Sequence, residues 1–237
     1  MDPRRALSFG AVADVYAVAR AGYPVEAVRF CLPPYARHVL DLGAGTGKLT
    51  SVLLDLGLEV TAVEPDEAMR AHIDPRATVL AGTAEDVPLA DASVDAVLVG
   101  QAWHWFDPQA ATASVLRVLR PGGTLGLLWN VLDDSSGWPL DVAELVGMED
   151  RLSLLAPEQT NPHDGAEALG PWSRHLFRHV QPADTDLVVA NVASRSVVIM
   201  QPTESRLALL DRVRAVLPEG ELEVPWVTDT WRATRPA

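Results

Sequence analysis

Short apolar runs alternate with stretches of helical apolar spacing along most of the chain, and this alternation predicts the fold class. The run at 93–100 is almost continuously apolar, as expected for a parallel strand that is covered on both faces. The pattern predicts an α/β fold in which helices cover both faces of a mostly parallel sheet. The strands are expected at residues 39–42, 57–64, 77–81, 93–100, 124–130, 172–180 and 222–231.

Apolar residues three and four apart predict the helices between these strands. Asp66 and Asp107 stand where helix N-caps are expected, and Asp107 is followed by a proline at the first helical position. The segment 120–123, Arg-Pro-Gly-Gly, predicts a turn into the fifth strand. The main helices are expected at residues 9–20, 25–32, 49–56, 108–119, 140–155, 186–196 and 203–216.

A glycine-rich turn joins the first predicted strand to the next helix. Its glycines follow a Gly43-x-Gly45-x-Gly47 spacing, with Ala44 between the first two. Gly43 permits a sharp turn, Gly45 lets main chain approach a ligand closely, and Gly47 lets the helix pack near the strand. Free amides at the helix start favour a negative or polar ligand group. The spacing is neither the dinucleotide G-x-G-x-x-G nor a Walker phosphate loop.

An acidic residue ends the second predicted strand. Glu64 lies seventeen positions after Gly47, where a carboxylate can accept hydrogen bonds from both hydroxyls of a ribose. The glycine loop and Glu64 together resemble motifs I and II of the class I S-adenosylmethionine (SAM) dependent methyltransferases. The resemblance is strong from about Phe9 to Trp129 and weak beyond, and within the superfamily it points to small-molecule enzymes of the trans-aconitate methyltransferase type.

This resemblance implies a Rossmann-like seven-stranded sheet in the order 3-2-1-4-5-7-6, with strand 7 antiparallel. It also implies an N-terminal helical cap, residues 1–36, and a methyltransferase domain, residues 37–237, in one globular unit. In the family the cap folds over SAM, with a Tyr and an Arg near the methionine carboxylate. The residues that the resemblance assigns to the cofactor are Tyr16, Arg20, Asp41, Gly43, Ala44, Gly45, Gly47, Glu64, Met69, Thr83, Ala84, Glu85 and Gln101.

The residues expected around the adenine of SAM depart from the family pattern at one position. The family often has Gly-Asp-Ala-Glu after the third strand, where the Asp takes the adenine amino group, but this chain has Thr83 there. Glu85 or a main-chain carbonyl can take the amino group instead, and the Ala84 amide can serve a ring nitrogen. Met69 matches the hydrophobic residue that similar proteins place against the adenine face, although a Met on a short helix is also typical of core.

The segment after the fourth strand, residues 101–107, combines aromatic side chains with one titratable group. Ligands of open α/β sheets bind beyond the carboxyl ends of the strands, so an apolar substrate pocket is expected here. His104 can orient a substrate carboxylate, remove a proton from an acceptor oxygen, or only hold the loop through a main-chain hydrogen bond. The candidate substrate residues are Phe9, Trp103, Trp105, Trp129 and Arg195.

Two of these substrate assignments have plain structural alternatives. Arg195 can pair with an anionic substrate, since Arg recognises carboxylates well, or with an acid of the protein's own core. The Trp residues of segment 101–107 can be core side chains. If the methyl acceptor is a carboxylate, it is already nucleophilic, so the reaction needs no general base.

Composition and charge argue against several classes of binding partner. The formal charge is −13 and no Lys/Arg cluster occurs, which argues against nucleic acid as the partner and leaves a small-molecule acceptor. The absence of a long apolar run and of a signal-peptide pattern predicts no membrane association and a cytoplasmic location. Cys31 is the only cysteine, and His175 and His179 fall on a predicted strand, so we expect no metal site. The sequence does not indicate an oligomeric state.

Alternative functions remain open at this point. A non-catalytic SAM-binding or regulatory protein would have the same cofactor residues. A nicotinamide-dependent oxidoreductase is opposed by the glycine spacing and by the lack of a Tyr-x-x-x-Lys pair, since Lys48 is the only lysine. A nucleic-acid methyltransferase would be expected to carry an Asn/Asp-Pro-Pro-Tyr motif or a basic face, and the sequence has neither.

Overall fold

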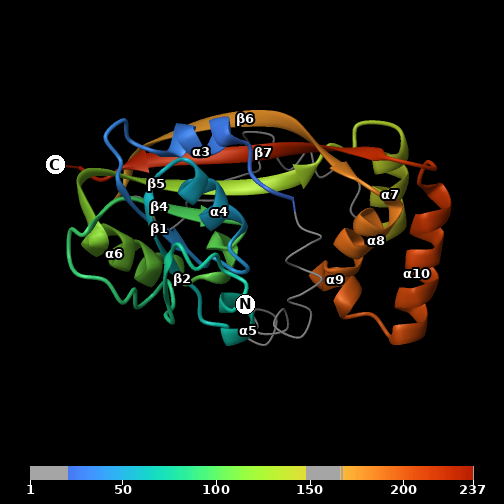
Figure 1. Cartoon of the computed structure of the whole chain (residues 1–237), viewed down its shortest axis with the longest axis horizontal. Helices are drawn as coiled ribbons and strands as arrows, with labels where there is room; N and C mark the ends of the chain where they lie inside the picture. The colour runs from blue at the N-terminus through green and yellow to red at the C-terminus, as the bar shows by residue number, and fades with distance from the viewer. Residues whose placement is uncertain (1–20, 148–165, 167, 237) are drawn as a thin grey trace.

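A computed structural model describes residues 21–147, 166 and 168–236. A seven-stranded sheet in the order β3-β2-β1-β4-β5-β7-β6 forms the centre of the molecule (Figure 1). The pairs among β1 to β5 are parallel, and β7 runs antiparallel to both β5 and β6. This order and the antiparallel seventh strand confirm the predicted topology. The strands are β1 His38–Leu42, β2 Glu59–Val63, β3 Thr78–Leu80, β4 Val94–Gly100, β5 Leu119–Leu132, β6 Gly170–Ala183 and β7 Leu222–Thr234.

Helices α3, α4 and α6 pack against the sheet, and helices α7 to α10 form a second group. Helices α3 and α4 share one hydrophobic core with the sheet, and α6 contributes to another. Helices α7 to α10 gather at one end of the molecule, at the right in Figure 1, beside the long strands β6 and β7. The helices are α3 Val25–Cys31, α4 Lys48–Asp55, α5 Glu67–Arg70, α6 Pro108–Val118, α7 Trp138–Val146, α8 Thr185–Ala193, α9 Ser196–Ile199 and α10 Thr203–Val216, with a short 3-10 helix η2 at Trp103–Trp105.

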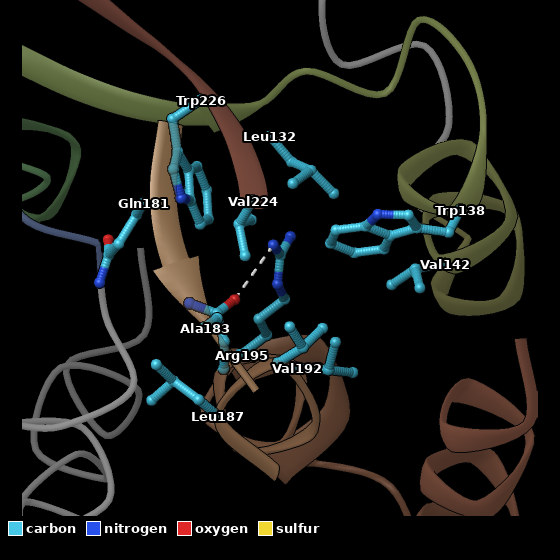
Figure 2. Close-up of a pocket in the computed structure, with 12 residues that line it drawn as sticks. Leu132, Trp138, Val142, Gln181, Ala183, Leu187, Val192, Arg195, Val224 and Trp226 are labelled. Carbon is cyan, nitrogen blue, oxygen red and sulfur yellow. Dashed lines mark hydrogen bonds between the residues drawn. The ribbon is translucent and has the colours of Figure 1, made fainter. Parts of the chain in front are cut away.

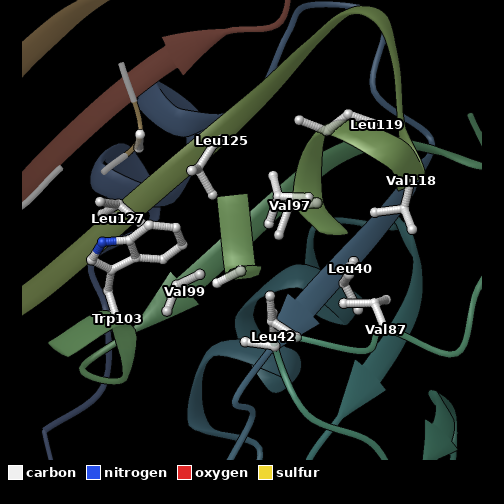
Figure 3. Close-up of a cluster of buried hydrophobic side chains, with 14 of the residues drawn as sticks. Leu40, Leu42, Val87, Val97, Val99, Trp103, Val118, Leu119, Leu125 and Leu127 are labelled. Atoms are coloured by element: carbon white, nitrogen blue, oxygen red, sulfur yellow. The ribbon is translucent and has the colours of Figure 1, made fainter. Parts of the chain in front are cut away.

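The core on the α6 side contains large side chains from β1, β4 and β5 (Figure 3). Leu40, Leu125 and Leu127 are fully buried, because parallel strands of the centre are covered on both faces. Trp103 joins this core: only 4% of it is exposed, and its ring meets Phe106 edge-on at 5.8 Å between centroids. Of the two alternatives that the sequence left open for Trp103, substrate pocket and core, its burial favours the core.

Several boundaries differ from the sequence prediction for physical reasons. Helix α7 begins at Trp138, two residues before the predicted start, and is followed by Gly147, which has the left-handed φ of 67° typical of a helix C-cap. Residues 148–155 of the helix predicted over 140–155 lie outside the described residues. The predicted turn at 120–123 is included in β5, where the register against β4 shifts between Val94 and Ala96 and Gly122 has a φ of 78°. The helix expected over 9–20 lies outside the described residues.

Candidate functional site

The glycine loop after β1 has the left-handed backbone that its sequence predicted. Gly43, Gly45 and Gly47 have φ angles of 69°, 56° and 83°. The amides of Gly43 and Ala44 donate to the Val63 carbonyl at 2.9 and 3.1 Å, which ties the loop to the end of β2. A Cβ at Gly43 would lie 2.8 Å from the Cβ of Ala102, but one at Gly45 would meet nothing within 4 Å. Gly45 therefore borders open space.

The carboxylate of Glu64 forms a hydrogen bond with this loop. Its Oε2 accepts from the Gly45 amide at 2.9 Å and its Oε1 from the Asp66 amide at 3.0 Å. Glu64 is 9% exposed, and burial raises its pKa despite these two bonds. Each oxygen keeps a further lone pair, so the carboxylate can still accept two ligand hydroxyls. The structure thus brings together the two motifs that the sequence linked only by spacing.

Two buried oxygens beneath the loop support a polar ligand there. Asp41 is 1% exposed and accepts from the Thr50 hydroxyl at 2.6 Å, and burial raises its pKa to about 7. Asp41 Oδ1 and Thr46 Oγ1 are buried and have no hydrogen-bond partner within the described chain. Buried polar atoms are rarely left unsatisfied, so these oxygens fit a site that holds a polar molecule.

The residues expected on the adenine side lie around α5 and the segment after β3. Asp66 caps α5 by accepting from the Met69 amide at 3.0 Å, and the Met69 side chain is 4% exposed. Ala84 is buried, while Thr83 and Glu85 are exposed. Glu85 Oε1 accepts from the amide of Asp107 at 2.9 Å, which joins this segment to the aromatic segment 101–107.

Gln101 has a strained backbone at the end of β4. Its φ is 58°, a left-handed value that residues other than glycine seldom adopt. Its amide donates to the Leu128 carbonyl at 2.9 Å, and its side chain donates to the Asn130 carbonyl at 2.8 Å. These bonds to β5 hold the strained conformation, which is typical of functional sites. The strain supports the assignment of Gln101 to the site.

The remaining aromatic residues of this region differ in exposure. His104 is exposed and its ring lies 4.8 Å from that of the half-buried Trp105. Trp129 is half-buried and packs against the core on the α6 side. Of the residues assigned to the cap and the substrate, Phe9, Tyr16 and Arg20 lie outside the described residues.

Asn130 connects β5 to three other parts of the molecule. Its side-chain amide donates to the Gly22 carbonyl at 2.8 Å, at the point where the N-terminal segment reaches the sheet. Its Oδ1 accepts from the Thr228 hydroxyl of β7 at 2.7 Å, and that hydroxyl lies 3.1 Å from His179 Nε2 of β6. Burial lowers the pKa of His179. Sequence reasoning missed Thr228, because its place opposite Asn130 depends on the register between β5 and β7.

Arg195 lies apart from the glycine loop, in a pocket that α7, α8 and the strands β5, β6 and β7 line (Figure 2). The pocket is open to solvent on one side. Trp138 and Trp226 line it too, and no local signal marks them, because the wall comes from five elements and the link after α8. Its lining residues are Leu132, Trp138, Val142, Gln181, Ala183, Leu187, Val188, Asn191, Val192, Arg195, Val224 and Trp226.

Comparison with known proteins identifies the family. The methyltransferase domain family matches residues 40–127. An uncharacterized methyltransferase of Mycobacterium tuberculosis strain H37Rv is 45% identical over 244 residues, which cover 96% of each chain. The chain belongs to the class I SAM-dependent methyltransferases. SAM is therefore its methyl donor, and the open space at Gly45 with the Glu64 carboxylate fits the place where the family holds it.

Solved structures agree with this methyltransferase assignment. A proposed type II methyltransferase from Anaeromyxobacter dehalogenans has a TM-score of 0.67 at 25% identity, covering 92% of this chain and 98% of that one. A proposed methyltransferase from an antibiotic biosynthesis pathway of Anabaena variabilis has a TM-score of 0.62 at 25% identity, covering 87% and 95%. The chain therefore shares its fold with these proteins over most of its length.

None of the helices within the described residues combines the length and the apolar character that crossing a membrane requires. In the same residues no three His, Cys, Asp or Glu side chains come together in a way that could hold a metal ion. Cys31, the last residue of α3, is fully buried, and burial raises the pKa of its thiol.

Proposed function

We propose that this methyltransferase moves the methyl group of SAM to a small-molecule acceptor, at a carboxylate or hydroxyl oxygen. The observation that carries the proposal is the Gly45–Glu64 pair, with open space at Gly45. It follows the carboxyl end of β1, which pairs with β4, and segment 101–107 begins at the carboxyl end of β4. That segment resembles the trans-aconitate methyltransferase type, whose acceptors are small acids. The net charge of −13 supports a small acceptor over nucleic acid.

The cofactor residues have distinct proposed roles. The glycine loop holds the methionine end with its main chain, and Glu64 accepts the ribose hydroxyls. Met69, Ala84 and Glu85 surround the adenine, with Glu85 exposed and able to accept from its amino group. Thr83 replaces the usual Asp, and its neutral hydroxyl leaves the amino group to Glu85 or to a main-chain carbonyl. Tyr16 and Arg20 of the N-terminal cap, residues 1–36, are proposed to hold the methionine carboxylate.

Methyl transfer from SAM requires little of the protein beyond the correct placement of the acceptor. Bound SAM supplies an electrophilic methyl group on a sulfonium, which an acceptor oxygen displaces in line. The chain's part is to align the acceptor and to exclude water, and such alignment can account for much of the rate. Gln101, held by its bonds to β5, closes the site beside the glycine loop. His104 is exposed on the neighbouring turn, where it can take the proton of a hydroxyl acceptor.

Calorimetric titration of the purified protein with SAM and, separately, with NADH tests the cofactor. We expect SAM to bind in the micromolar range and NADH not to bind. Gly45→Arg fills the open space at the loop and should abolish SAM binding. Glu64→Ala should weaken it by about tenfold to a hundredfold, because bonds to a charged group are lost.

The matched control is Gly57→Arg. Gly57 also has a left-handed φ, 80°, and open space for a Cβ, but it lies in the turn between α4 and β2. It should bring similar strain and leave SAM binding intact. Equal loss in both variants, or NADH binding without SAM binding, would contradict the proposal. Screening of small acids and alcohols with methyl-labelled SAM then identifies the acceptor.

A further inference from the structure

The short segment 21–23, which precedes α3, crosses the carboxyl ends of two strands. The Gly22 carbonyl accepts from the side chain of Asn130, near the carboxyl end of β5. Tyr23 lies at the end of β4, since a Cβ built on Gly100 would come 2.5 Å from its hydroxyl oxygen. The carboxyl ends of the strands form the edge where open α/β sheets bind their ligands. Segment 21–23 therefore lies beside the region proposed to hold SAM.

Asn130 holds this segment through its side-chain amide. Its Nδ2 lies 2.8 Å from the carbonyl oxygen of Gly22 and 3.4 Å from that of Ala21. A carbonyl can only accept, so the nitrogen of the Asn130 side chain faces the segment and its oxygen faces Thr228. The Thr228 hydroxyl donates to that oxygen at 2.7 Å, so the proton of its 3.1 Å bond with His179 must come from Nε2. These neighbours fix the orientation of the Asn130 amide.

The main chain of Asn130 is bonded to the strained end of β4. Its carbonyl accepts from the Gln101 side chain at 2.8 Å, and Gln101 has the left-handed φ of 58°. Asn130 thus bonds both to the segment before α3 and to a residue assigned to the cofactor site. A substitution of the Asn130 side chain breaks the first contact and keeps the second, because the second uses only the main-chain carbonyl.

A proposed cofactor residue directly precedes this segment in the sequence. Arg20, which the proposed function assigns to the methionine carboxylate of SAM, is joined to Ala21 by one peptide bond. Consecutive Cα atoms are about 3.8 Å apart, so whatever fixes Ala21 also restricts the residue before it. Ala21 is 8% exposed and belongs to a hydrophobic cluster with Leu132 and Trp226. Packing and the bonds from Asn130 therefore act on the same point of the chain.

We infer that Asn130 is a positioning residue for the methionine end of SAM. Its side-chain amide fixes segment 21–23 at the ends of β4 and β5, and the segment in turn places Arg20 for the methionine carboxylate. Without the bond, this part of the chain has to lose more conformational freedom when SAM binds, which weakens the hold on the methionine end and not on the adenosine end. The inference rests on the proposed function, to which it adds a residue that acts through segment 21–23.

Calorimetry of the full chain with two ligands tests the inference. S-adenosylhomocysteine, the product of methyl transfer, carries the amino-acid group of SAM. Methylthioadenosine has the same adenosine and a thioether sulfur but lacks that group. The unaltered protein should bind S-adenosylhomocysteine at least about tenfold more tightly, because charge-assisted bonds hold its carboxylate. Arg20→Ala should remove most of this preference.

The decisive variant is Asn130→Asp, which keeps the size of the side chain and the acceptor for Thr228. It loses the N–H donor and puts a carboxylate oxygen opposite the Gly22 carbonyl. We expect affinity for S-adenosylhomocysteine to fall about tenfold and affinity for methylthioadenosine to change less than about twofold. Asn130→Ala should show the same selective loss at about threefold to fivefold, and here no new charge can cause it. The matched control is Asn191→Asp, at a buried asparagine of α8, which should change neither affinity.

The two ligands separate positioning from a merely structural role. An equal loss of both ligands in the two Asn130 variants, or no loss of either, overturns the inference. A preference that is lost in Arg20→Ala but kept in the Asn130 variants also contradicts the inference and leaves the proposed function intact. Absence of S-adenosylhomocysteine binding in the unaltered protein, or a preference that survives Arg20→Ala, contradicts the proposed function instead.

Discussion

The glycine-loop site, called the cofactor end here, and the pocket lined by α7 and α8, the pocket end, are built in different ways. At the cofactor end, the Gly45 amide, the Glu64 carboxylate and the buried Asp41 come from one short segment of strand, loop and strand. At the pocket end, Trp138, Arg195 and Trp226 come from separate segments of the chain's second half. The family match covers residues 40–127, which includes the first end and stops before the pocket.

This difference explains why the donor is identified and the acceptor class needs a proposal. The cofactor end uses main-chain amides, positive φ angles and one acid, so a short sequence motif determines which ligand it binds. The pocket end uses side chains whose identity can change without altering the sheet. Members of the family can therefore share SAM as donor while differing in acceptor.

The largest effect is expected at the glycine loop. Gly45→Arg should lower SAM affinity at least about a hundredfold, or 2.7 kcal/mol, because the new side chain fills the open space that Gly45 borders. Gly57→Arg, in the turn between α4 and β2, should leave SAM affinity unchanged. Calorimetric titration with SAM checks this. Equal loss in both variants would show that backbone strain causes the effect rather than the place of Gly45 in the loop.

A change in the sheet between the two ends should weaken both through stability. A Cβ at Gly126 of β5 would lie 2.5 Å from the Cβ and 2.6 Å from the Sγ of Cys31, so α3 must move in Gly126→Ala. We expect a loss of about 2 kcal/mol, or a fall in Tm of about 4 to 8 °C, measured by thermal unfolding. The control Gly170→Ala, where a Cβ meets nothing within 4 Å, should change Tm little. Similar Tm values would contradict tight packing of α3.

The pH dependence of stability tests the buried acid beneath the glycine loop. Burial raises the pKa of Asp41 to about 7, so the folded state binds a proton that the unfolded state lacks between pH 7 and pH 4. Without SAM, the wild type should gain about 1 kcal/mol of unfolding free energy per pH unit on acidification through this range, relative to Asp41→Asn. Denaturant unfolding at pH 8, 6 and 5 measures it. Parallel curves for the two proteins would exclude a raised pKa.

The smallest effect is expected at His104. Its side chain is exposed, so bulk water reaches it and can carry a proton away from the acceptor. His104→Gln should therefore lower kcat by about tenfold or less, whereas loss of a general base costs about 10²- to 10⁴-fold. Methyl transfer from labelled SAM to the screened acceptor gives kcat. A loss above a hundredfold, with a changed pH profile, would establish His104 as the base.

Sequence patterns predicted the parts of the molecule whose signals are local. The strand order was implied by the motif resemblance and is confirmed, and the caps at Asp66 and Asp107 accept the main-chain amides expected of them. For Trp103 the sequence left both the substrate pocket and the core open, and its side chain is buried among core residues. Local spacing does not say on which side of a turn a ring will pack.

The sequence by itself determined the α/β class, the glycine loop and the acid at the end of β2, and with them the methyl donor. These features follow from backbone geometry within a few residues, where φ preferences and strand periodicity act directly. Only the tertiary structure decided that Arg195 and Trp226 line one pocket and that Asn130 joins β5 to β7. Such contacts depend on strand register and helix packing between distant segments, which no local pattern specifies.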